Sequence, residues 1–321
     1  MSGAPGTLGR PTRGLILGLL LMAAGAGAPL RAETIDVVVT IKPIHSLVSQ
    51  VMQGVAEPTL LVDGSASPHS FSLKPSHIRA IDNAGVFIRV SERLEPFTGK
   101  IVRSLPAGVR LVTLAEAPGV RLLSQRTTGT FERDRHGHDA EAIKDAGAGG
   151  DSHIWLAPAN AKAIGLYVGG VLAERYPEHA PRFKANAERL VTEINALTAE
   201  LEKETTPLRG RPFVVFHDAY QYFDESFDLD AVGSITVSPD VQPSAKRLME
   251  LRQKIRTLGA VCVFAEPWFQ PRLVAALTEG TDARAGTLDP EGTSLTPGPQ
   301  LYFTLMRNLA AGLKACLAPA T

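Results

Sequence analysis

The sequence predicts an α/β protein with two similar α/β lobes, each built on a parallel sheet, joined by a long helix. Short β-branched runs alternate with helical patterns near both ends of the chain, and a long amphipathic pattern lies between them. The length of 321 residues suits about two domains. The content of 44% hydrophobic and 21% charged residues excludes disordered and collagen-like proteins. The net charge of zero argues against a nucleic-acid-coating protein, so no nucleic-acid partner is expected.

The N-terminal segment 1–32 has the layout of a secretory signal peptide. It contains no acidic residue; Arg10 and Arg13 precede an apolar core at 14–24, and small residues lead to Ala32. A membrane anchor is the alternative, but the core is short for one, and no later apolar run approaches the roughly 20 residues that span a bilayer. We therefore predict cleavage after Ala32 and a soluble protein in the periplasm.

The chain contains two cysteines, too few for a disulfide-rich scaffold or a four-cysteine zinc site. Neither lies near the predicted cleavage site, which excludes a lipid anchor there and suits a Gram-negative periplasm. In an oxidising compartment Cys262 and Cys316 can form a disulfide. Two unpaired buried thiols remain the alternative.

The N-terminal lobe is predicted over 33–159. Its strands are expected at 34–41, 59–62, 86–90 and 111–114, with helices opening at Pro43 and near Pro75. Residues 115–152 are rich in Gly, Asp, Arg and His and have no periodicity. They predict a long mobile loop, of a length that is usually either functional or disordered.

A helical region at 160–206 separates the two lobes. One helix is expected from Asn160, a good N-cap residue, to Arg175. The second, from Pro181 to Thr205, keeps its apolar residues on one face and would rise by roughly 37 Å, enough to link two lobes. The C-terminal lobe at 207–321 repeats the alternation, with strands at 213–216, 231–236, 261–264 and 285–287, and helices at 244–258, 270–278 and 301–317.

Three of the eight histidines stand out by their position. His69 lies just beyond the strand at 59–62, His153 lies at the exit of the long loop, and His217 directly follows the strand at 213–216. Ligand sites in open α/β sheets gather at the carboxyl ends of strands. Asp289 follows the strand at 285–287 and is a fourth candidate, although a simple Asp-Pro turn would also explain it.

Three imidazoles and one carboxylate make a credible tetrahedral zinc site. Imidazole suits zinc, copper, iron and nickel, whereas manganese and magnesium favour oxygen ligands. Because each lobe supplies two of the four residues, a metal ion would sit in the cleft between the lobes and hold them together. His45 is expected beside this cleft, and Asp218 and Glu266 are candidates to orient a ligating imidazole. His77 and His179 are expected on the surface.

Six motifs, in this order, resemble one protein family over essentially the whole mature chain. They span residues 41–44, 68–76, 151–158, 216–223, 264–267 and 288–290, including Pro68-His69-Ser70-Phe71 and Phe216-His217-Asp218-Ala219. The sequence resembles the periplasmic zinc-binding subunits of metal-importing ABC transporters, a cluster of receptors for zinc and manganese.

The resemblance implies Zn²⁺ as a transported ligand, held by His69, His153 and His217, with Asp289 at the family's carboxylate position or a water completing the shell. It also implies a rigid linking helix, a monomeric protein, an inner-membrane ABC permease as partner and, in the zinc branch, a Cys262–Cys316 disulfide. Relatives often carry a histidine-rich loop before the second ligand. Here the loop holds only His136 and His138, which would capture zinc weakly or belong to a plain solvated loop.

Three histidines are also compatible with two other functions. A manganese receptor of the same family commonly has a carboxylate in place of the third histidine, so His217 favours zinc. A zinc hydrolase would use three histidines and an open position to activate water. The chain has no His-Glu-x-x-His motif and no obvious general base. The sequence therefore predicts a binding protein and not an enzyme.

Overall fold

The computed structural model describes residues 1–4, 6, 9, 34–64, 66–126, 131, 150–236, 244–267 and 271–318. Contacts divide the chain into two units, Met1–Thr34 and Ile35–Thr321, and every helix and strand named below belongs to the second. Most of the proposed signal peptide lies outside the described residues. In the described part, no helix has the length and apolar character that a membrane crossing requires.

The N-terminal lobe is built on a four-stranded parallel sheet with the order β2-β1-β3-β4. The two central strands are buried throughout, as is usual for parallel sheets covered on both faces. All four strands were predicted, although β1 is shorter than the expected run at 34–41. The elements are β1 (Val37–Val39), α1 (Lys42–Met52), β2 (Thr59–Leu60), α2 (Pro75–Asp82), β3 (Val86–Arg89), α3 (Thr98–Val102) and β4 (Arg110–Thr113).

The C-terminal lobe repeats this architecture. Its parallel sheet has the order β6-β5-β7-β8, which is the order of the first lobe when the strands are counted from the start of each lobe. The sequence shows no such repeat, but the two similar α/β lobes that it predicts are confirmed. The elements are β5 (Phe213–His217), α6 (Gln221–Phe227), β6 (Ala231–Thr236), α7 (Ala245–Leu258), β7 (Cys262–Ala265), α8 (Pro271–Thr278), β8 (Arg284–Thr287) and α9 (Leu301–Leu317).

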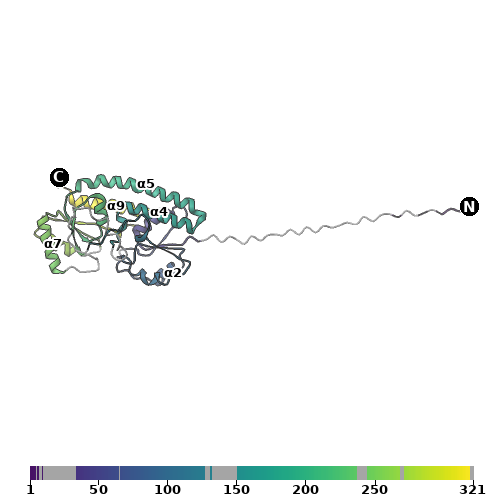
Figure 1. Cartoon of the computed structure of the whole chain (residues 1–321), viewed down its shortest axis with the longest axis horizontal. Coiled ribbons are helices and arrows are strands. Elements are labelled where there is room, and N and C mark those ends of the chain that lie inside the picture. The colour runs from purple at the N-terminus through teal and green to yellow at the C-terminus, as the bar shows by residue number, and fades with distance from the viewer. Residues whose placement is uncertain are drawn as a thin grey trace. The chain divides into compact units, whose positions relative to one another are not determined.

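Two helices connect the lobes, α4 (Pro158–Arg175) and α5 (Ala180–Thr205). Figure 1 shows α5 extending from α4 to α9, so the predicted linking helix is confirmed. The start of α4 differs from the prediction, because Ala157 occupies the N-cap position and Pro158 begins the helix. The Asn160 side chain instead accepts a hydrogen bond from Arg121 N at 2.8 Å and donates one to Arg121 O at 2.9 Å.

Helices α4 and α5 approach closely because α4 places a glycine against α5. A Cβ atom at Gly169 would lie 2.8 Å from the Cβ of Ala187, whereas one at Gly170 would meet nothing within 4 Å. We expect Gly169→Ala to lower the free energy of unfolding by about 1–3 kcal/mol, because overpacking forces the helices apart. The matched variant Gly170→Ala should raise it by about 0.5–1 kcal/mol, since alanine favours helix. Urea unfolding of both variants measures these changes, and equal effects would contradict the packing argument.

The first lobe also holds a late segment of the chain, residues 290–299. Three side chains of α1 donate hydrogen bonds to its backbone carbonyls: Lys42 to Thr293 and Leu295 at 2.7 and 3.1 Å, Ser46 to Pro299 at 3.1 Å, and Gln50 to Pro299 at 2.9 Å. Trp155 of the first lobe donates its indole N–H to Pro290 O at 2.8 Å. These bonds tie the segment after β8 to the opposite lobe.

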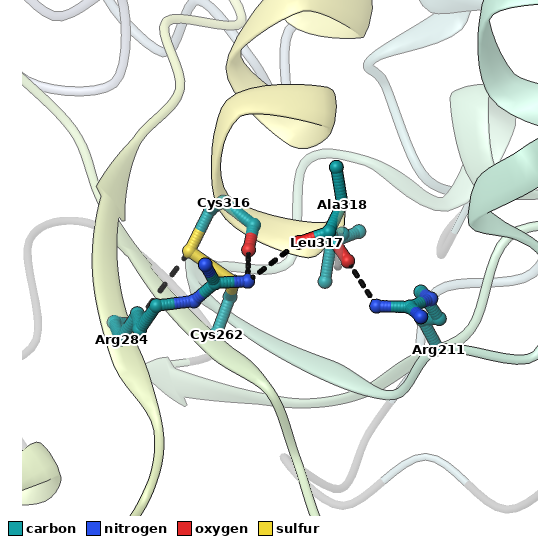
Figure 2. Close-up of a disulfide and its surroundings, with 6 residues drawn as sticks. All are labelled: Arg211, Cys262, Arg284, Cys316, Leu317 and Ala318. Atoms are coloured by element: carbon teal, nitrogen blue, oxygen red, sulfur yellow. Dashed lines mark hydrogen bonds between the residues drawn. A yellow bond between two sulfur atoms is a disulfide. The ribbon is translucent and has the colours of Figure 1, made fainter. Parts of the chain in front are cut away.

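A disulfide joins β7 to α9. The bond between Cys262 and Cys316 has an S–S distance of 2.08 Å (Figure 2), which confirms the predicted pairing over the alternative of two unpaired thiols. The guanidinium of Arg284 donates to the carbonyl oxygens of Cys316 and Ala318, and that of Arg211 donates to Leu317 O. The last carbonyls of a helix lack partners within the helix, so these arginines stabilise the end of α9.

Candidate metal site

Three imidazoles meet between the two lobes. His69, His153 and His217 each offer a ring nitrogen, and these atoms all lie within 4.8 Å of one another. The Nε2 atoms of His153 and His217 are 3.3 Å apart, and the three ring centroids are separated by 5.2 to 6.2 Å. Among the described residues this is the one group of three or more His, Cys, Asp or Glu side chains that could hold a metal ion.

Each histidine is placed by a different part of the fold. His217 is the last residue of β5, at the carboxyl edge of the second sheet. His153 directly precedes the 3₁₀ turn η3 (Ile154–Leu156), which is buried throughout. His69 lies in the loop between β2 and α2. The carboxyl edge of a parallel sheet is the usual place for a ligand site, and the site draws one residue from the second lobe and two from the first.

The His217 imidazole is oriented by a buried carboxylate. Its Nδ1 lies 2.5 Å from Glu266 Oε1, and Glu266 directly follows β7. An ionised carboxylate can only accept, so Nδ1 carries a proton, and in the neutral ring Nε2 faces His153 with its lone pair. Burial by itself lowers the pKa of His217, but the negative charge of Glu266 and its hydrogen bond outweigh burial, so the pKa lies above its usual value.

The His153 imidazole has a carboxylate partner of its own. Its Nδ1 lies 2.7 Å from Asp151 Oδ1, which also accepts a hydrogen bond from His153 N at 3.0 Å. Both residues are buried. The sequence suggested Asp218 as an orienting residue, but Asp218 forms an ion pair with Arg126 at 3.0 Å and, in the described part of the chain, hydrogen-bonds to no imidazole. The prediction for Asp218 is wrong, and the one for Glu266 agrees with its hydrogen bond to His217.

His69 lacks such an anchor. Its Nε2 atom is buried and has no hydrogen-bond partner among the described residues. Burial and the two neighbouring imidazoles lower the pKa of His69 to about 2, so its ring stays neutral and keeps a free lone pair. A buried polar atom without a partner costs free energy of about 1–3 kcal/mol. The arrangement therefore favours a ligand that the three imidazoles share.

Asp289 lies outside the group of converging nitrogen atoms. Its two carboxylate oxygens accept hydrogen bonds from Glu291 N at 3.2 Å and from Thr293 Oγ1 at 3.0 Å. These bonds are those of an Asp-Pro turn that begins the segment held by α1. A role for Asp289 as fourth ligand stays a prediction.

The other histidines have local partners. His45 Nε2 lies 2.9 Å from Pro58 O in the first lobe, which gives the buried ring a structural role. His77 stacks on Phe71 with ring centroids 5.5 Å apart. His179 packs edge-on against Phe183 at the start of α5, with centroids 6.2 Å apart. His136 and His138 lie outside the described residues.

Both ends of the predicted long loop at 115–152 have a defined structure. A 3₁₀ turn, η1, covers Leu114–Glu116, and Ser124 forms an antiparallel bridge with Gly150. Asp151 N donates to Leu123 O at 2.8 Å, so the bridge holds Asp151 beside His153. Asp151 was not predicted as a partner of an imidazole, although it lies within the motif at 151–158. Its position two residues before a candidate ligand was the available signal.

Comparisons with known proteins agree on one family. The family described as "Zinc-uptake complex component A periplasmic" matches residues 37–316. The high-affinity zinc uptake system protein ZnuA of Brucella suis is 42% identical over 327 residues, covering 95% of this chain and 98% of its own. The protein of the same name from Yersinia pestis is 31% identical, covering 90% and 93%.

Solved structures of other proteins share the fold. A crystal structure of ZnuA superposes with a TM-score of 0.73 at 22% identity, covering 89% of this chain and all of the other. The laminin-binding adhesin of Streptococcus agalactiae superposes with a TM-score of 0.71 at 21% identity, covering 88% and 98%. With a family match over residues 37–316 and a 42% identical relative of nearly equal length, the chain belongs to the ZnuA family of periplasmic zinc-uptake components.

Proposed function

We propose that this protein captures Zn²⁺ in the periplasm and delivers it to an inner-membrane ABC permease. The observation that carries the proposal is the convergence of three imidazole nitrogen atoms from two lobes. Two nitrogens bound to one tetrahedral zinc ion at 2.0–2.1 Å lie about 3.4 Å apart. The Nε2 atoms of His153 and His217 are already 3.3 Å apart, so this pair needs almost no rearrangement to bind zinc.

The ligand chemistry favours zinc over manganese. Within the described residues, the converging group contains three imidazoles and no carboxylate. Manganese prefers oxygen ligands, whereas imidazole is a good ligand for zinc. A calorimetric competition tests this preference: displacement of bound Zn²⁺ by excess Mn²⁺ would contradict a zinc receptor.

We propose a binding role and not a hydrolytic one, since the relatives are named as zinc uptake proteins. The two carboxylates beside the site are hydrogen-bonded to the imidazoles, which favours a role in orienting the ligands. Zinc-dependent turnover of ester or phosphate substrates by the purified protein would support the alternative.

Further parts of the proposal concern the mature chain. We propose that residues 1–32 are removed on export, that the mature chain is a monomer, and that 33–159, 160–206 and 207–321 are its lobes and linking region. Asp289 or a water would complete the zinc shell. His136 and His138 would capture zinc for transfer to the main site; a deletion of residues 132–150 that leaves zinc stoichiometry and uptake in scarce zinc unchanged would remove that role.

Elemental analysis tests the function most directly. The protein as purified is expected to contain one zinc per chain at the main site. Removal of the ion with a chelator followed by titration with Zn²⁺ should restore the same stoichiometry. Copper or nickel in place of zinc, or no metal after titration, would contradict the proposal.

Zinc should stabilise the fold, and acid should remove this effect. A ligand at 100 times its Kd adds about 2.7 kcal/mol to the free energy of unfolding. Ligating imidazoles must be neutral, and His217 has a raised pKa, so protons begin to compete with zinc above the usual imidazole pKa of about 6.5 and compete more strongly as the pH falls further. Thermal unfolding with and without Zn²⁺ should show a large increase in Tm at pH 8 that disappears near pH 5. An increase that is equal at both pH values would contradict imidazole ligation.

A further inference from the structure

We propose that Asp151 and Glu266 are positioning residues for the bound zinc ion. Each holds one imidazole at Nδ1 so that its Nε2 faces the ion, and together they supply two negative charges that match a divalent cation. The inference rests on the proposed function, because it concerns the same three imidazoles.

The two carboxylates share two geometric features. One oxygen of each lies at hydrogen-bond distance from an imidazole Nδ1, at 2.7 Å for Asp151 and 2.5 Å for Glu266. The second oxygen of each, Asp151 Oδ2 and Glu266 Oε2, is buried without a hydrogen-bond partner in the described part of the chain. Each carboxylate therefore acts on the site through one imidazole, whose tautomer and ring orientation it fixes.

The charges of the two carboxylates need a counterion. Asp151 is 5% exposed and Glu266 is 2% exposed. In the described structure their ion pairs are with the imidazoles of His153 and His217, and no lysine or arginine contacts either one. Isolated buried charges are costly, whereas a paired and hydrogen-bonded charge is tolerated. Imidazoles that ligate a metal are neutral, so in the zinc-bound protein a doubly charged ion at their centre would balance two carboxylates.

The chain contains a natural control for this argument. Asp218 is the neighbour of His217 in sequence, is 8% exposed and is close in burial to Asp151. Its carboxylate is paired with Arg126 at 3.0 Å and makes no hydrogen bond to an imidazole within the described residues. The effect of Asp218 on the ion would come from its charge alone, and the guanidinium compensates that charge.

The test compares three amide variants of the mature protein: Asp151→Asn, Glu266→Gln and Asp218→Asn. Zn²⁺ affinity is measured by competition with a chelating dye. Outer partners of ligating histidines typically change metal affinity by about 10- to 100-fold, which is the loss expected for Asp151→Asn and for Glu266→Gln. Asp218→Asn should change the affinity by less than about threefold, because Asp218 does not touch a ligand.

A spectroscopic readout separates positioning from general stability. Co²⁺ replaces Zn²⁺ and its visible absorption bands report the ligand geometry. Asp151→Asn and Glu266→Gln should shift or weaken these bands, and Asp218→Asn should leave them as in the wild type. Because an amide variant could fail to fold, Asp151→Glu and Glu266→Asp are included; each keeps a carboxylate and should bind zinc more tightly than the corresponding amide.

The outcomes are distinct. Wild-type binding of one zinc, with Asp151→Asn and Glu266→Gln both within threefold of the wild-type affinity, would overturn the positioning role and leave the proposed function intact. An equal loss in all three amide variants would also overturn it, since proximity of charge would then suffice. If the wild type itself bound no zinc, the proposed function would fail first.

Discussion

Replacing His217 with alanine is expected to weaken Zn²⁺ binding more than 100-fold. The substitution removes a ligand that the fold holds at the end of β5, and the loss should exceed the 10- to 100-fold effect typical of outer partners. It also leaves Glu266 buried without its imidazole, which should lower the free energy of unfolding of the zinc-free protein by about 1–3 kcal/mol. Competition titration measures the affinity and urea unfolding measures the stability.

A matched variant, His179→Ala, distinguishes the ligand role from the loss of any imidazole. His179 contacts Phe183 at the start of α5 and belongs to no group of ligand atoms in the described residues. Its replacement should leave zinc affinity unchanged. Retention of the wild-type affinity by His217→Ala, within tenfold, would remove His217 from the proposed ligand set.

Removal of the disulfide should produce the largest loss of stability. Cys262 and Cys316 are 54 residues apart, and the chain-entropy model gives a loop of this size about 4 kcal/mol. The double variant Cys262→Ala/Cys316→Ala should lose about this amount in urea unfolding, because its unfolded chain is less restricted. Wild-type protein in a reducing agent provides the control and should lose a similar amount.

Zinc affinity should not change in the same double variant. Cys262 is the first residue of β7, whereas Glu266 follows the last residue of that strand. The disulfide therefore lies at the amino edge of the sheet and the imidazoles at its carboxyl edge. A loss of less than 1 kcal/mol in stability, or a marked loss of zinc affinity, would contradict this separation of roles.

The sequence predicts the strands well because their signal is local. Runs such as Val37-Val38-Val39 and Phe213-Val214-Val215-Phe216 are β-branched or aromatic, and both lie in buried strands. Helix α6 escaped prediction, because it is seven residues long and its buried aromatic residues give too short a pattern to recognise. The start of α4 was misplaced because an asparagine can serve a neighbouring backbone as well as its own helix.

The candidate site was predictable only in part. Three histidines near strand ends follow from topology, because the carboxyl ends of parallel strands share one edge. The partners of the imidazoles depend on the direction of the side chains, which the order of residues in the chain does not give. Asp218 is next to His217 in sequence but pairs with Arg126, whereas Glu266 is 49 residues from His217 and hydrogen-bonds to its imidazole. The hydrogen bonds from α1 to residues 293–299 link positions about 250 residues apart, so no local sequence pattern predicts them.

These hydrogen bonds from α1 have a consequence for the release of the bound ion. Lys42, Ser46 and Gln50 hydrogen-bond to residues 293–299 of the second lobe, so the two lobes cannot separate without breaking several partly buried hydrogen bonds. Release of the ion by a wide separation of the lobes should therefore cost more free energy. Movement of the His69 loop should cost less free energy, since the His69 ring makes no hydrogen bond to a carboxylate in the described chain. Displacement of this loop would remove one ligand from the ion while the two lobes stay in contact.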